Sequence, residues 1–112
     1  MYQLLIGLVV FLSIAKEVHS QEIYGVLSRG ANHLIRGALV TATCGSNENQ
    51  ATTDSSGMYR IDTNTAATCD LRIDVDGIRA RYEPRIFLSS GQTARYDFEL
   101  VRIGNSYELY RK

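Results

Sequence analysis

The 112-residue chain carries 12 basic and 12 acidic side chains, so its formal net charge is zero. A balanced charge argues against a nucleic-acid partner, because binding to phosphates requires an excess of cationic side chains. Two cysteines without clustered histidines do not supply the four ligands of a structural zinc site, so neither a metal nor a cofactor is expected.

The N-terminal segment has the pattern of an export signal. Leu4 to Ile14 is an apolar run of roughly 11 residues, shorter than the ~20 that a membrane-spanning helix needs. Val18 and Ser20 fit the −3 and −1 positions of a cleavage site, which predicts a signal peptide over residues 1–20 and a mature domain over residues 21–112. Cleavage after Ala15 and retention as an uncleaved anchor are the alternatives.

Cleavage would leave no stable membrane span, and the protein would be periplasmic or extracellular. The mature length suits one domain and is too short for two.

The mature sequence alternates apolar and polar residues with a period of two, which predicts β-strands. Strands are expected over residues 21–27 and 37–44, followed by a small polar loop and another strand from Ala51. The Asp54-Ser-Ser-Gly57 turn then leads into a strand from Met58 to Ile61. A further strand contains residues 69–75.

The C-terminal half continues this period. A long strand is expected over residues 78–88, where Pro84 indicates a sheet edge or a break into two strands. Residues 92–101 form the clearest alternating strand, and residues 106–110 follow the Gly104-Asn105 turn. About seven short strands and no helix pattern predict a single antiparallel Greek-key β-sandwich of the transthyretin-like or Ig-like kind.

Cys44 and Cys69 are the two cysteines, and both lie in the predicted mature chain. On their strands, Cys44 shares a face with Val40, and Cys69 shares a face with Leu71, so both sulfurs should point inward. In an oxidising compartment this favours a disulfide. Two buried free thiols are the alternative.

Several spaced motifs resemble those of the carboxypeptidase regulatory-like domain, a family of transthyretin-like β-sandwiches. The motifs are Ile23-x-Gly25-x-Leu27, Leu34-Ile-Arg-Gly37-Ala-x-Val40, Thr53-Asp54-x-x-Gly57-x-Tyr59-x-Ile61, Leu71-x-Ile73-x-Val75 and Asp97-Phe98-Glu99-Leu100. The resemblance covers residues 23 to about 101 and implies fold more than function.

Four motif residues have expected folding roles. Asp54 should accept hydrogen bonds from backbone amides of its turn, and Gly57 should adopt a positive φ. Gly37 is expected to allow a close backbone approach at a strand start, and Tyr59 to fill the space between the sheets.

Enzymes related to this sandwich need residues that this chain lacks. Hydroxyisourate hydrolases require several histidines and a Tyr-Arg-Gly-Ser ending, whereas His33 is the sole histidine after the predicted cleavage, and Tyr110-Arg111-Lys112 matches that ending only in part. The chain is therefore expected not to be an enzyme, and a hydrolase of that kind is a minor alternative.

Arg79, Arg81, Tyr82 and Arg85 form the candidate partner-binding stretch, because arginine and tyrosine are favoured in protein contacts. In the simpler interpretation, Arg79 and Arg81 pair with Asp74 and Asp76 as ordinary surface charges. The main functional hypothesis is an exported, non-catalytic module that binds a protein or a glycan. A self-associating structural or accessory subunit of a cell-envelope assembly is the second hypothesis.

Overall fold

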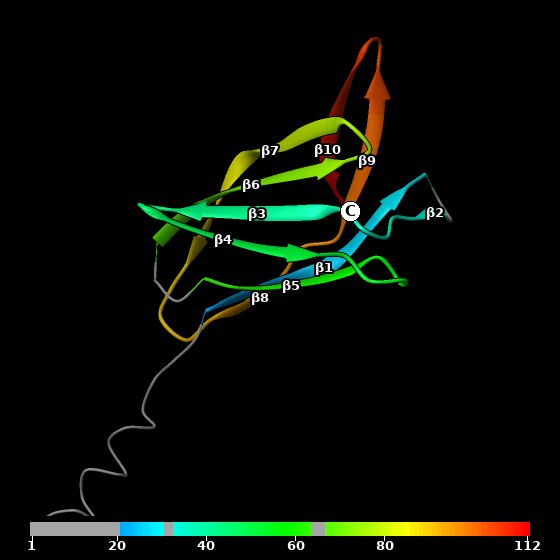
Figure 1. Ribbon diagram of the computed structural model, residues 1–112. Coiled ribbons are helices and arrows are strands. Elements are labelled where there is room, and N and C mark those ends of the chain that lie inside the picture. Colours follow the sequence, from blue (N-terminus) through cyan, green and yellow to red (C-terminus); the bar gives the residue numbers. More distant parts are fainter. Residues whose placement is uncertain (1–20, 31–32, 64–66) are drawn as a thin grey trace, which may run out of the picture.

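The computed structural model describes residues 21–30, 33–63 and 67–112, and these residues form two β-sheets without a helix (Figure 1). One sheet has the strand order β4-β3-β6-β7, and the other has the order β10-β9-β1-β2, with β5 and β8 also paired to β1. The strands are β1 (Glu22–Arg29), β2 (His33–Leu34), β3 (Leu39–Cys44), β4 (Asn47–Thr52), β5 (Met58–Asp62), β6 (Ala67–Val75), β7 (Ile78–Leu88), β8 (Thr93–Arg95), β9 (Phe98–Ile103) and β10 (Ser106–Arg111).

The predicted all-β sandwich is confirmed, and its core lies between the two sheets. Alternation places the odd-numbered apolar side chains of β6 and the even-numbered side chains of β3 inward, as expected. Tyr59, Val40 and Leu71, which were expected to face inward, are buried. The predicted signal peptide at residues 1–20 lies outside the described residues. Within the described part, no helix is long and apolar enough to cross a bilayer.

Cys44 and Cys69 form the predicted disulfide. They are cross-strand partners on β3 and β6, with a Cα–Cα distance of 4.1 Å, and both side chains are buried. The bridge therefore joins neighbouring strands of one sheet. It does not connect the two layers.

β7 is an edge strand of the four-stranded sheet, and this agrees with the presence of Pro84. Tyr82 pairs with Leu71 and Ile86 pairs with Cys69, so residues 83–85 of β7 stand opposite Asp70 alone. This bulge accommodates the proline without ending the strand.

The Asp54 turn forms as predicted. Asp54 Oδ1 accepts hydrogen bonds from the amides of Ser56 (2.8 Å) and Met58 (3.0 Å). Gly57 has a φ of 74°, and a Cβ atom there would lie 2.7 Å from the carbonyl oxygen of Leu27. The close approach predicted at Gly37 is wrong, because a Cβ there would meet nothing within 4 Å. Gly37 instead allows a φ of 76°.

The predicted polar loop after Cys44 is also wrong in extent. Only Gly45 and Ser46 form the turn, and Asn47 pairs directly with Cys44 at the start of β4. The residues 47–50 are polar because β4 is an edge strand, where main-chain pairing to β3 defines the strand without an apolar side-chain pattern.

The predicted strand over residues 92–101 is divided into β8 and β9. Both strands pair in parallel with β1, a departure from a purely antiparallel sandwich. Their registers are the same: Glu22 faces Thr93 and Leu27 faces Phe98, a constant offset of 71 positions (93 − 22 and 98 − 27). One chain segment therefore follows the same edge of β1 and leaves the ladder only at Tyr96 and Asp97.

The interruption is caused by a turned carbonyl group. In an unbroken parallel ladder, the Tyr96 carbonyl would accept the Val26 amide. Here the Tyr96 carbonyl accepts the Tyr59 hydroxyl at 2.6 Å, and Asp97 Oδ1 accepts the Val26 amide at 2.8 Å. A Cβ on Gly25 would lie 1.9 Å from the same carbonyl oxygen. We call Gly25, Tyr59, Tyr96 and Asp97 the β1 crossing.

Removing the disulfide should weaken the fold without changing it. The Cys44→Ala/Cys69→Ala variant should lose about 3–4 kcal/mol of unfolding free energy, because the bridge closes a loop in the unfolded chain. Urea titration followed by circular dichroism measures the difference. The oxidised wild type should resist thiol alkylation unless a reductant is added, and alkylation without one would contradict the bridge.

The β1 crossing predicts a strict requirement for glycine at position 25. Gly25→Ala should cost more than about 3 kcal/mol of unfolding free energy, because the new methyl group collides with a main-chain carbonyl. Gly104→Asn is the matched control, since Gly104 has a φ of 64° in open space and asparagine tolerates that conformation. Equal urea midpoints for the two variants would contradict the role of Gly25.

Candidate functional site

The four residues of the predicted partner-binding stretch all lie on β7, but they do not share a face. Arg79, Arg81 and Arg85 are exposed on the outer face of the sheet. Tyr82 points into the sandwich, where its ring centroid lies 4.9 Å from that of Phe98 and 6.1 Å from that of Tyr96. The structure therefore assembles the three arginines and assigns the tyrosine to the core.

Each of the three arginines contacts a carboxylate. Arg79 Nε lies 2.7 Å from Asp74 Oδ1, and Arg85 Nε lies 3.3 Å from Asp70 Oδ1. The predicted pairing of Arg79 with Asp74 is thus confirmed.

Arg81 pairs with Glu83 at 3.6 Å, so its expected pairing with Asp76 is wrong. The sheet register explains this, because it places Arg72 opposite Arg81 and leaves Asp76 in the β6–β7 turn. These exposed pairs contribute little to stability.

Phe87 is a feature of this face that the sequence reasoning missed. Phe87 is 69% exposed, which is unusual for a large apolar residue on a strand. Phe87 has the same parity as Arg79, Arg81 and Arg85, and this parity was the available signal for an outward orientation. We call these four residues the β7 outer face.

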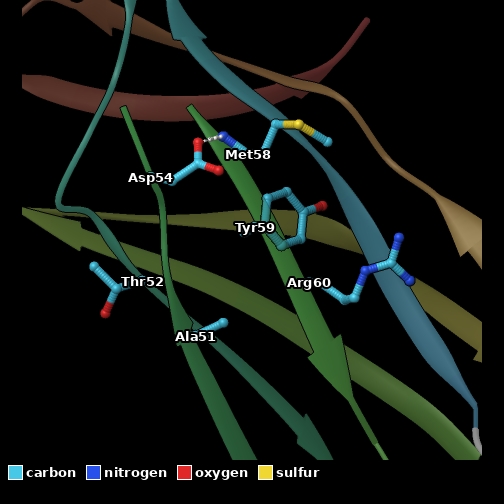
Figure 2. A pocket seen from close by; sticks show the side chains of 6 residues that line it. All are labelled: Ala51, Thr52, Asp54, Met58, Tyr59 and Arg60. Carbon is cyan, nitrogen blue, oxygen red and sulfur yellow. Dashed lines mark hydrogen bonds between the residues drawn. The ribbon is translucent and has the colours of Figure 1, made fainter. Parts of the chain in front are cut away.

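A hollow of about 300 Å³ lies between the edge strands β4 and β5, and Figure 2 shows the side chains that line it: Ala51, Thr52, Asp54, Met58, Tyr59 and Arg60. In Figure 2, the side chains of Met58 and Arg60 extend over β1, away from Ala51 and Thr52. The hydrogen bonds from the Leu27 amide to the Gly57 carbonyl and from the Thr63 amide to the Gln21 carbonyl flank β5 and fix the phase of its ladder with β1.

By the alternation of an antiparallel ladder, the main-chain groups of Arg60 point the other way, toward the hollow. This hollow suits recognition of an extended backbone.

The same region holds no set of groups arranged for catalysis. The Asp54 carboxylate is engaged by two turn amides. The Tyr59 hydroxyl donates a hydrogen bond to the Tyr96 carbonyl. Burial raises the pKa of Tyr59 well above its ordinary value, and the Asp97 charge adds to this rise. Over the described ranges, no three His, Cys, Asp or Glu side chains gather where they could hold a metal ion.

The family model of the carboxypeptidase regulatory-like domain matches residues 22–101. The chain belongs to this family. The motif residues on which the resemblance was based lie in the turns, on the inner faces and at the β1 crossing described above. No curated protein matches the sequence significantly.

Three solved structures share the general fold at low identity. A "putative carbohydrate binding protein" from Bacteroides uniformis has 17% identity and a TM-score of 0.48, over 83% of this chain and 54% of its own. A "putative cell adhesion protein" from Bacteroides fragilis has 8% identity and a TM-score of 0.45, over 86% of this chain and 45% of its own. Catechol 1,2 dioxygenase from Acinetobacter radioresistens has 13% identity and a TM-score of 0.42, over 89% and 54%.

This chain therefore spans about half the length of these proteins. Likeness at such identities and TM-scores carries no information about what this chain binds.

The ion pairs predict a measurable change at Asp74. The hydrogen bond from Arg79 is the main cause that holds the pKa of Asp74 below its ordinary value, so this pair stabilises the fold above the unfolded-state pKa and is lost as the pH falls through the folded-state pKa. Arg79→Gln should raise the Asp74 pKa toward its ordinary value in an NMR titration of the carboxyl carbon. Arg102→Gln is the control, and an unchanged Asp74 pKa in Arg79→Gln would contradict the pairing.

Proposed function

We propose that this protein is an exported, non-catalytic β-sandwich module that binds a partner protein through the β7 outer face. The observation that carries the proposal is Phe87, an aromatic side chain 69% exposed on an edge strand and accompanied by three arginines. Aromatic and arginine side chains contribute most of the binding energy at protein interfaces. A glycan is the alternative ligand for this face.

Export is supported by the leader pattern at residues 1–20 and by the disulfide. Structural disulfides persist in oxidising compartments outside the cytosol. In this proposal the signal peptide is removed after Ser20, and residues 21–112 form the mature domain in the periplasm or outside the cell.

The absence of catalysis in this proposal is supported by the state of the candidate nucleophiles. Ser55 and Ser56 lie in the Asp54 turn, and Ser89 donates its hydroxyl to Gln92 at the next turn. His33 is exposed in the two-residue strand β2. A serine nucleophile needs an adjacent base, and these contacts do not provide one.

The second candidate is a self-associating subunit of an envelope assembly. An exposed aromatic on an edge strand could equally contact a second copy of the same chain. Sedimentation of the purified oxidised protein at micromolar concentration separates the two: a monomer supports a different partner protein, and a dimer that Phe87→Ser dissociates supports self-association.

The β7 outer face predicts a selective loss of binding. Phe87→Ser should weaken the partner by roughly 30-fold, which corresponds to about 2 kcal/mol for an aromatic at the centre of an interface. Arg79→Glu/Arg81→Glu should weaken it through repulsion and lost contacts. The assay is affinity capture from the native compartment, followed by titration of the captured protein.

Ile103→Ser is the matched control, because Ile103 is an exposed apolar residue of β9 that lies outside this face. It should leave binding unchanged. Retention of the partner by Phe87→Ser and by the double arginine variant would overturn the proposal.

A further inference from the structure

A second hollow, of about 270 Å³, lies at one end of the sandwich, and its described lining includes none of the four residues of the β7 outer face. It is lined by Arg29, His33, Leu34, Ile35, Arg36 and Asp76. These residues come from the end of β1, from β2, from the connection to β3 and from the β6–β7 turn. We call it the end hollow.

The end hollow carries positive charge that its own residues do not neutralise. Elsewhere in the described chain, six arginines pair with carboxylates: Arg60, Arg72, Arg79, Arg81, Arg85 and Arg95. Neither Arg29 nor Arg36 forms an ion pair with any described residue. Among the described residues of the lining, Asp76 is the one carboxylate, so these residues carry an excess of cationic charge.

The position of Arg29 is fixed by an aromatic contact. Its guanidinium carbon lies 5.9 Å from the ring centroid of Tyr107 on β10. Arg29 also stands opposite His33 in the β1–β2 ladder, and this pairing holds β2 beside the hollow. One of the two cationic groups is therefore positioned before any ligand arrives.

The hollow has an apolar part next to these cations. Leu34 is 54% exposed, and the neighbouring Ile35 is buried. A ligand that fits both parts has an anionic group and an apolar group within a few ångströms of each other. Guanidinium groups bind carboxylates with two parallel hydrogen bonds, a geometry that lysine does not provide.

We propose that the end hollow binds the C-terminal carboxylate of a polypeptide whose last side chain is apolar. The carboxylate contacts Arg29 and Arg36, and the last side chain packs on Leu34 and Ile35. A sugar acid would offer the same carboxylate, but a sugar ring binds best on an exposed aromatic face, and none of the described lining residues is aromatic. The polypeptide terminus therefore matches both halves of the hollow.

The test uses acetyl-Gly-Gly-Leu as the free acid and as the C-terminal amide, two probes that differ only in the terminal charge. Titrated into the purified oxidised protein, the free acid should shift the amide resonances of Leu34, Ile35 and Gly77, with a dissociation constant on the order of 1 mM for so small a ligand. The amide should bind at least about tenfold more weakly, because it lacks the charge-assisted hydrogen bonds.

Arg36→Gln should weaken the free acid by about tenfold, and Leu34→Ser should weaken it while preserving the preference for the acid over the amide. Arg102→Gln is the matched control, since Arg102 is exposed on β9 and donates to the Gly104 carbonyl. Circular dichroism establishes that each variant is folded. Phe87→Ser should bind the peptide as the wild type does. Failure of the proposal for the β7 outer face can therefore be distinguished from failure of the proposal for the end hollow.

Three outcomes would overturn the proposal. They are equal binding of acid and amide, unchanged binding in Arg36→Gln, and absence of shifts up to about 20 mM of the free acid, the limit of a useful weak affinity. Tighter binding of glucuronate than of the peptide acid would also overturn the proposal, and it would indicate an acidic glycan as the ligand of the end hollow.

Discussion

The turned carbonyl of Tyr96 is the constraint on which the second sheet depends. Three residues stabilise this orientation. The Tyr59 hydroxyl donates a hydrogen bond to the turned carbonyl, the Asp97 carboxylate accepts one from the Val26 amide, and Gly25 provides the space. The Tyr96 carbonyl and the Val26 amide thus each obtain a side-chain partner in place of each other. Loss of one contact would leave a buried donor or acceptor without a partner, which costs more than a hydrogen bond normally contributes.

The β1 crossing also connects the two layers. Because Tyr59 and Tyr96 are held there, their rings form a cluster with Phe98 and Tyr82, and Tyr82 belongs to the opposite sheet. The disulfide lies within the four-stranded sheet, so it cannot connect the layers. Contacts between side chains of the two inner faces therefore connect them, and the disulfide restricts the unfolded chain.

Alternation in the sequence predicted the inner faces correctly, because a strand with one buried face must repeat every two residues. It therefore identified the inward-facing cysteines, whereas the turn residues identified the Asp54 turn and Pro84 indicated the edge position of β7. It failed where side-chain pattern does not define structure. Residues 47–50 are polar and still form β4, since pairing to β3 uses main-chain groups alone.

The division at Tyr96 and Asp97 was not predictable either, because the alternation passes through these residues without a break. The sequence contained all three residues that compensate for the turned carbonyl, but their connection requires contacts across up to 71 positions of the chain. The register that places Arg72, and not Asp76, opposite Arg81 is likewise defined by no local pattern.

The motif residues that place the chain in its family are engaged in the fold: Gly25, Asp97 and Tyr59 at the β1 crossing, and Asp54 and Gly57 at the turn. The binding proposed above must then come from side chains other than these five.

The distribution of charge narrows the choice among these side chains. On the outer face of the four-stranded sheet, Asp70 and Asp74 neutralise arginines of β7. On the other sheet, Glu22 contacts Arg60 and Asp97 contacts Arg95, with both guanidinium groups placed over the ring of Tyr24.

A charged ligand that approaches either outer face must compete with these ion pairs for the arginines. On the β7 outer face, the exposed Phe87 offers apolar contact that does not meet this competition. The end hollow differs, because neither Arg29 nor Arg36 forms an ion pair with a described residue. The proposed recognition of an anion therefore falls at the end of the sandwich, and the proposed contact through apolar surface falls on its edge strand β7.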